Sequence, residues 1–208
     1  MAVKDIVTAV LTFNATEVVE LVNAEIAAET GVDEILNIGL IGAMDVVGKR
    51  FSEGDLFVPE MLMAAQAMKA GLAVLKPHLS SAAAVSKGTI VIGTVKGDLH
   101  DIGKNLVAML MEGGGFNVVD LGVDIDAKQF VEAAVEHNAD VVALSALLTT
   151  TLPAMEAIIG AIREAGIATK IIIGGAPVTA AFADRIGADG YSKDAPGAVE
   201  QARRLIAV

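Results

Sequence analysis

The sequence predicts an α/β fold in two parts, a small N-terminal bundle of helices followed by a doubly wound, five-stranded parallel sheet. Residues 1 to about 80 carry apolar residues at helical spacing and contain no convincing strand. Beyond residue 88, short apolar runs rich in β-branched residues alternate with helical segments, as parallel strands and their crossover helices do. We therefore expect a helical bundle domain over residues 1–84 and a sheet domain over residues 85–208.

The N-terminal part should be a four-helix bundle. Asn14 followed by Glu17 resembles a helix cap with its reciprocal partner, and Gly31 stands where a left-handed residue would end that helix. Short helices with one apolar stripe can bury it only against one another. The clearest stripe repeats at steps of three and four through Val58, Met61, Ala65, Met68, Leu72 and Leu75. The small and polar residues 80–87 suit a linker between the domains.

The C-terminal part should contain five strands and five helices. We expect strands at 89–95, 117–121, 140–144 and 170–173, and a short one at 188–191. Helices are expected near 104–112, 126–137, 152–165, 177–186 and 195–206. The simplest strand order is 2-1-3-4-5, which places a ligand crevice at the carboxyl ends of the first and third strands.

Composition excludes several classes of function. The formal charge of −11 argues against a nucleic-acid partner, because such proteins need a basic surface. There is no cysteine, so histidine, of which there are three, is the obvious soft ligand for a transition metal. No uninterrupted apolar run approaches the ~20 residues of a membrane span, and the N-terminus does not read as a signal peptide, so we expect a cytoplasmic protein without a membrane partner.

The loop that leaves the first predicted strand carries the most informative residues. It reads Lys-Gly-Asp-Leu-His-Asp-Ile-Gly-Lys-Asn over residues 96–105, so His100 stands between two carboxylates at the expected crevice. A phosphate loop does not fit, because five residues separate Gly97 from Gly103 and Asn105 replaces the magnesium-binding hydroxyl. The glycine spacing of a dinucleotide fingerprint is also absent.

Four segments in the right order resemble the cobalamin-binding proteins of corrinoid methyltransferase systems. Asp98-x-His100-x-x-Gly103 resembles the signature of their cobalamin-binding domain. Ser145-Ala-Leu-Leu-Thr149-Thr-Thr151 and Gly174-Gly175 resemble its second and third cofactor-contacting segments. Residues 48–61 are similar to the helical cap of methionine synthase and of the small methanol, methylamine and O-demethylase corrinoid proteins. The implied sheet domain is flavodoxin-like and of Rossmann type.

The resemblance implies a role for each matching residue. His100 would be the metal ligand, reaching cobalt on the lower face of the corrin, and Asp98 and Thr151 would complete a hydrogen-bond relay behind it. The implied cofactor-binding residues in the sheet domain are Gly97, Asp98, His100, Asp101, Ile102, Gly103, Ser145, Leu147, Thr149, Gly174 and Gly175.

Phe51, Val58 and Met61 would cover the upper face of the corrin, although a Met-rich helical stripe could equally be bundle core. Methionine synthase has leucine and valine at the last two of these positions, and apolar bulk is kept here.

The implied function is that of a methyl carrier. Such a protein takes a methyl group onto cobalt from a substrate-specific methyltransferase and yields it to a second methyltransferase that acts on a thiol or tetrahydrofolate; a reductive activation protein is a further expected partner. The chain would not catalyse the reaction alone. Three alternatives stay open: a subunit of an adenosylcobalamin-dependent mutase, a cobalamin-sensing regulator, and a nucleotide-binding protein of flavodoxin type.

Overall fold

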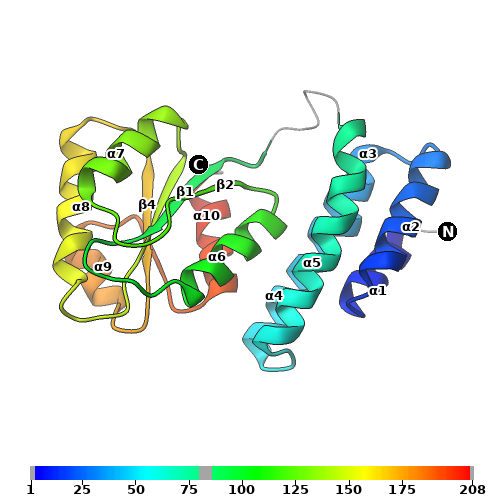
Figure 1. The fold of residues 1–208 in the computed structure, drawn as a ribbon, viewed down its shortest axis with the longest axis horizontal. Coiled ribbons are helices and arrows are strands. Elements are labelled where there is room, and N and C mark those ends of the chain that lie inside the picture. The colour runs from blue at the N-terminus through cyan, green and yellow to red at the C-terminus, as the bar shows by residue number, and fades with distance from the viewer. Residues whose placement is uncertain (1–2, 80–85, 207–208) are drawn as a thin grey trace. The chain divides into compact units, whose positions relative to one another are not determined.

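The computed structural model describes residues 3–79 and 86–206, which fall into two compact units (Figure 1). The predicted domain boundary at 84/85, and residues 80–85 of the predicted linker, lie outside the described residues.

The first unit consists of helices joined by short turns, without a strand among its described residues. Its segments are α1 (Val3–Leu11), α2 (Ala15–Ala27), α3 (Val32–Glu34), the π-helix η1 (Ile35–Ile41), α4 (Gly42–Glu53), α5 (Val58–Leu75) and the 3-10 turn η2 (Lys76–His78). Because α3, η1 and α4 follow one another without a break, the unit contains four helical stretches, and the predicted bundle is confirmed.

Helix α5 packs closely against α2 and η1 at Gly71. A Cβ atom there would lie 2.6 Å from Val18 Cγ1 and 2.9 Å from Leu40 Cδ2, so a glycine is needed for this approach. The predicted cap of α2 is also confirmed, since the Glu17 N–H donates to Asn14 Oδ1 and the Asn14 amide donates to the Glu17 carboxylate at 2.9 Å.

Two local predictions for this unit were wrong or incomplete. Gly31 has a φ of −55° and precedes α3, whereas Glu29, with a φ of 57°, is the left-handed residue. The helix ends earlier because the Thr30 N–H donates to the Glu25 carbonyl oxygen and its hydroxyl to the Glu25 carboxylate. The π-helix was not predicted: the Gly42 N–H donates to the Asn37 carbonyl oxygen, five residues back.

One stretch of the described residues, Val58–His78, is long and apolar enough to cross a membrane, with a mean hydropathy of 1.2. This stretch consists of α5 and η2. It was not predicted from the sequence, where only uninterrupted apolar runs were considered. Length and composition are weak evidence for a span, because the core helix of a bundle has the same properties. Several α5 residues are indeed buried, among them Met61, Met68 and Leu75.

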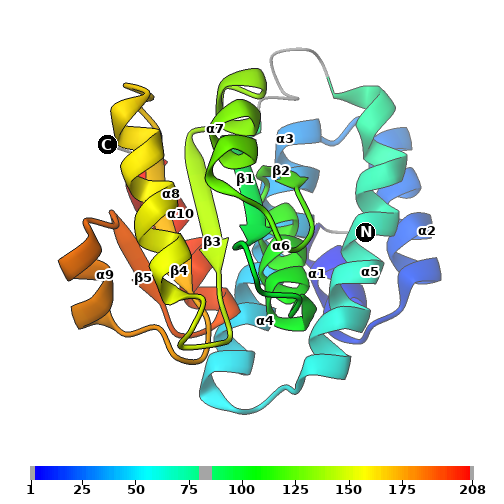
Figure 2. The same cartoon turned by 60° about the vertical axis from the view of Figure 1, so that its left-hand side comes forward.

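The second unit is a parallel five-stranded sheet in the order β2-β1-β3-β4-β5, as predicted. Its strands are β1 (Thr89–Thr94), β2 (Asn117–Asp120), β3 (Val141–Ser145), β4 (Lys170–Gly174) and β5 (Gly190–Ser192). Its helices are α6 (Ile102–Gly113), α7 (Ala127–Glu136), α8 (Leu152–Glu164), α9 (Ala180–Ile186) and α10 (Ala195–Ile206). Helices α7 and α8 cover one face of the sheet, and α6 and α10 cover the other (Figure 2).

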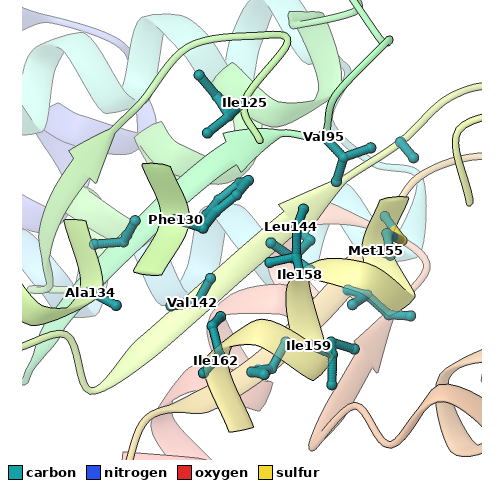
Figure 3. Packing of buried hydrophobic residues seen from close by; sticks show 14 of the residues in the cluster. Val95, Ile125, Phe130, Ala134, Val142, Leu144, Met155, Ile158, Ile159 and Ile162 are labelled. Carbon is teal, nitrogen blue, oxygen red and sulfur yellow. The ribbon is translucent and has the colours of Figure 1, made fainter. Parts of the chain in front are cut away.

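The core beneath α7 and α8 follows from the alternation of the strands. Val142 and Leu144 of β3 point to this side, where they meet Phe130 of α7 and Ile158 of α8 (Figure 3). The alternate residues of β3, Val141 and Ala143, point to the other face and are also buried, so this central strand is buried on both sides.

The register aligns the carboxyl ends of four strands. Thr94 of β1 is paired with Ser145 of β3, Ser145 with Gly174 of β4, and Gly174 with Ser192 of β5. The loops after β1, β3 and β4 therefore leave the sheet at one edge. The strand order reverses between β1 and β3, since β2 lies on one side of β1 and β3, β4 and β5 lie on the other, and sheets of this kind bind ligands at that point.

Candidate functional site

The β1–α6 loop presents His100 at the carboxyl edge of the sheet. The buried Thr94 hydroxyl donates to the His100 carbonyl oxygen at 2.8 Å, which ties the loop to the end of β1. Gly97 has a φ of 84°, a conformation suited to glycine, and lets the chain turn back after Val95. The histidine thus lies on a short loop held by the sheet itself.

Asp98 is fully buried and accepts five hydrogen bonds. Its Oδ1 accepts from the His100 backbone N–H at 3.1 Å and lies 2.6 Å from His100 Nδ1. Its Oδ2 accepts from the N–H groups of Leu147 and Leu148, at 2.7 and 3.2 Å, and from the Thr151 hydroxyl at 2.9 Å. One carboxylate therefore joins the loop after β1 to the loop after β3.

These donors keep Asp98 ionised. Burial by itself raises the pKa of Asp98, but the hydrogen bonds from the Leu147 N–H, the His100 ring and backbone, and the Thr151 hydroxyl outweigh it. The pKa of the carboxyl consequently lies well below its ordinary value of 3.8.

The contact with Asp98 determines which nitrogen of His100 is available. An ionised carboxylate can only accept, so Nδ1 carries the hydrogen, and the neutral ring has its lone pair on Nε2. The side chain is 51% exposed, and no hydrogen bond to Nε2 occurs within the described part of the chain. This arrangement is typical of a histidine that binds a metal through Nε2.

Exposed apolar side chains occur on both loops that meet at Asp98. Four large ones are between 41% and 77% exposed: Leu99 and Ile102 beside His100 in the chain, and Leu147 and Leu148, whose N–H groups reach Asp98. Exposed apolar residues gathered in this way indicate a binding surface. Sequence reasoning missed Leu99 and Leu148, although bulky apolar residues in otherwise polar loops were a usable signal.

The loop after β4 approaches the loop after β3 too closely for any side chain. Gly175 has a φ of 127°, and a Cβ atom there would lie 1.8 Å from the Ala146 carbonyl oxygen. A Cβ on Gly174 would lie 3.1 Å from the Ser192 carbonyl oxygen. Within the described residues, the hydroxyls of Ser145 and Thr149 have no recorded hydrogen-bond partner, so they are available to a ligand.

A second carboxylate, missed by sequence reasoning, holds the start of the His100 loop. Asp124 accepts from the Gly97 N–H at 2.8 Å and from Lys96 Nζ at 3.0 Å. The Gly97 N–H, and then Lys96, lower the pKa of Asp124. Gly97 and Lys96 precede Asp124 by 27 and 28 residues, so no motif spacing in the sequence predicted these contacts.

The remaining predicted residues lie as follows. Asp101 and Gly103 flank the first residue of α6 and are exposed. Phe51 of α4 and Val58 of α5 are half-buried, and Met61 of α5 is buried, which suits bundle core as well as a cap. These three belong to the first unit, as does Phe57, an exposed aromatic residue that was not among the predicted cap residues.

No cluster of three or more His, Asp or Glu side chains able to hold a metal ion occurs in residues 3–79 and 86–206. His78 ends η2 and His137 caps α7, so both stand at helix ends, as predicted. A metal at His100 would therefore receive its other ligands from a cofactor or from solvent.

Comparison with known proteins finds the same family for both units. Models of the B12 binding domain match residues 88–200 and residues 2–76. Dimethylamine corrinoid protein 1 of Methanosarcina acetivorans is 49% identical over 177 residues, which cover 84% of this chain and 83% of the relative.

Solved structures agree. A chain of the methanol:cobalamin methyltransferase complex of Methanosarcina barkeri is 33% identical with a TM-score of 0.86, covering 97% of this chain and 78% of that one. A cobalamin-binding protein of Desulfitobacterium hafniense is 32% identical with a TM-score of 0.84, covering 99% and 98%.

Proposed function

The chain belongs to the B12-binding family of corrinoid proteins, and on that premise we propose that it carries a methyl group between two methyltransferases. Its cofactor is a corrinoid. The first partner would be specific for the methylated substrate, and the second would act on a thiol or tetrahydrofolate acceptor. A reductive activation protein would restore the carrier when its cofactor is oxidised.

The geometry of His100 carries this proposal. When bound, the corrinoid supplies a cobalt atom on which a methyl group can be held and passed on. His100 would offer Nε2 to that metal, because Asp98 holds Nδ1–H at 2.6 Å and keeps the other nitrogen unprotonated. Thr151, which donates to the same carboxylate, would help to retain the charge of Asp98 as the ligation of His100 changes.

The surrounding residues fit a large, flat, mainly apolar ring. Ile102 and Leu147, together with Leu99 and Leu148, would contact its lower face, and the exposed Gly97, Asp101 and Gly103 would let it approach the backbone. Ser145 and Thr149 would donate hydrogen bonds to the nucleotide tail in a slot that Gly174 and Gly175 keep free of side chains.

We assign the upper face to the helical unit. Phe51, Val58 and Met61 would shield the reactive side of the cofactor from water between encounters with the two partners. This cap would have to move away for each transfer.

Similarity favours a methylated amine as the donor. The dimethylamine corrinoid protein is 49% identical to the chain, whereas the chain from the methanol complex is 33% identical. The partner methyltransferase, and not this chain, would recognise the amine itself.

The first experiment is reconstitution with hydroxocobalamin. We expect the wild type to retain the corrinoid through gel filtration and His100→Ala to lose it about 10–100-fold more readily, with a changed visible spectrum. His137→Ala, which removes a helix-end histidine from the same unit, is the matched control and should behave as wild type. Equal retention and equal spectra for wild type and His100→Ala would contradict the assignment.

The carrier role needs a second measurement. The loaded wild type is first reduced to the Co(I) state with a low-potential reductant such as titanium(III) citrate. Single-turnover mixing with dimethylamine and a dimethylamine-specific methyltransferase should then transfer one methyl group to the cofactor and release monomethylamine, and a thiol-specific methyltransferase with its thiol should remove the methyl group as a thioether. A loaded protein that neither enzyme alters, with both enzymes active on another corrinoid protein, would rule out this pair of partners.

A further inference from the structure

The second unit contains an ion pair between a buried lysine and an exposed aspartate that the proposed function does not use. Lys104 lies in the first turn of α6, and Asp120 ends β2. The Lys104 side chain is 1% exposed and its Nζ donates to Asp120 Oδ2, whereas the Asp120 side chain is 38% exposed. Lys104 Nζ also donates to Asn105 Oδ1 at 2.6 Å.

Stability alone does not account for this lysine. Removing an ammonium group from water is costly, and an apolar residue of similar volume often serves as well or better. The first turn of a helix also disfavours a positive charge, because the helix dipole is positive there. A role in placing its neighbours explains the charge better than a contribution to folding does.

The ion pair belongs to a ring of contacts that closes on His100. Asp120 Oδ1 accepts from the Gly122 N–H at 2.9 Å, and the Gly122 carbonyl oxygen accepts from the Thr94 N–H at 2.9 Å. The Thr94 hydroxyl in turn donates to the His100 carbonyl oxygen.

The other half of the ring runs through the start of α6. Asn105 Nδ2 donates to Asp101 Oδ2 at 3.2 Å, and the Asn105 N–H donates to the Asp101 carbonyl oxygen at 2.7 Å. Asp101 follows His100 directly, so the chain of contacts from Asp120 through Lys104 and Asn105 ends beside the histidine.

We propose that Lys104 and Asp120 are positioning residues that fix the main chain of His100, so that its imidazole meets the cobalt of the corrinoid without first being ordered. The inference rests on the proposed function, since it requires His100 to be the metal ligand. Asp98 holds the imidazole from the β3 side of the loop, and the Lys104–Asp120 pair holds the main chain from the β2 side. Because the His100 loop is already ordered, corrinoid binding does not have to offset the entropy lost in ordering it.

Lys104→Met tests this assignment. It removes the tether but keeps an apolar side chain of similar length, and Asp120 is exposed enough to stay hydrated, so the protein should fold. We expect hydroxocobalamin affinity about tenfold weaker than wild type. The Co(II) form should show a smaller fraction of His-ligated cobalt by EPR, and the backbone amides of residues 97–103 in the protein without corrinoid should exchange with deuterium severalfold faster.

Lys128→Met is the control for loss of a lysine from the same unit. Lys128 pairs with Glu132 on the solvent-exposed side of α7, and its replacement should leave all three quantities within about twofold of wild type. Asn105→Ala cuts the ring at an exposed residue and should change the same three quantities in the same direction by a smaller factor, which keeps the inference testable if Lys104→Met fails to fold.

The possible failures are distinct. If the wild type itself shows no His-ligated cobalt, the proposed function is wrong. If the wild type shows it, and neither Lys104→Met nor Asn105→Ala alters affinity, ligation or exchange, then the pair is only structural and the inference is overturned.

Discussion

The proposed chemistry of this protein depends most on Asp98, a buried carboxylate surrounded by donors from two loops, those after β1 and β3. Two backbone N–H groups and the hydroxyl of Thr151 satisfy Oδ2, while the ring and backbone of His100 satisfy Oδ1. Because every one of these groups donates, the Asp98 side chain can accept all five hydrogen bonds only while it is ionised. The same charge selects the tautomer of His100 that leaves Nε2 free.

Asp98→Asn should lower the free energy of unfolding of the second unit by about 2–3 kcal/mol near neutral pH. The amide is uncharged, and its NH₂ group must face either the His100 ring or the donors on the β3–α8 loop. Urea denaturation measures the loss. Asp184→Asn, an exposed change on α9, is the control and should cost less than about 0.5 kcal/mol.

The cost of Asp98→Asn should depend on pH. Because the folded pKa of Asp98 lies below its ordinary value of 3.8, the stabilisation is fully present above that value and is lost as pH falls through the folded pKa. The difference in unfolding free energy between the wild type and Asp98→Asn should therefore shrink progressively below about pH 4. A difference that grows as the solution becomes more acidic would contradict the ionised carboxylate.

At the scale of elements, three loops from β1, β3 and β4 build the site, and their spacing is set by backbone contact. The closest contact is at Gly175, where an added Cβ would overlap the Ala146 carbonyl oxygen. Because that oxygen belongs to the main chain, it cannot rotate away as a side chain could. The slot between these two loops therefore depends on glycine.

Gly175→Ala should disrupt this slot. We expect the second unit to lose about 2–3 kcal/mol of unfolding free energy, from the steric overlap and from a backbone conformation that alanine rarely adopts. Hydroxocobalamin retention should fall as well. Gly160→Ala is the matched control: it lies on α8 with no atom within 4 Å of the added Cβ, and should leave stability unchanged or raise it by about 0.5–1 kcal/mol. Equal stabilities for the two variants would show that the close approach at Gly175 is unimportant.

The elements themselves were largely predictable from the sequence. The strands and their order followed from short apolar runs separated by helical segments, which are local patterns with few topological solutions. The π-helix at 35–41 was not predictable in this way, because a π turn has almost the same apolar pattern as the α turn it replaces.

The site was predictable only in part. The residues Asp98, His100 and Thr151 could be singled out because they match a known motif. The contacts that make them work, from the N–H groups of Leu147 and Leu148 to Asp98, join residues 49 and 50 positions apart and carry no side-chain signature. The Lys104–Asp120 pair was invisible for a similar reason, since a lysine in a helix is normally a surface residue.

At the scale of the whole molecule, both described units match B12-binding domains. One is a helical bundle and the other a sheet with a single exposed histidine at its ligand-binding edge. The net charge of −11 disfavours nucleic acid as a partner and would favour proteins with basic faces. In the proposed function the reaction is divided between the cofactor, the partner enzymes and this chain, which would hold the cofactor and shield it.

The most direct test of the account is EPR spectroscopy of the Co(II) form of the reconstituted protein, prepared with ¹⁴N-histidine and with ¹⁵N-histidine. We predict a three-line nitrogen splitting of the cobalt signal that becomes two lines on ¹⁵N-histidine labelling. In His100→Ala, where His78 and His137 are still present, any remaining splitting should come from the base of the cofactor's own nucleotide tail and should not respond to the label. A wild-type spectrum that is unchanged by the label, or a label-sensitive splitting that survives in His100→Ala, would contradict the assignment of His100 as the ligand of the metal.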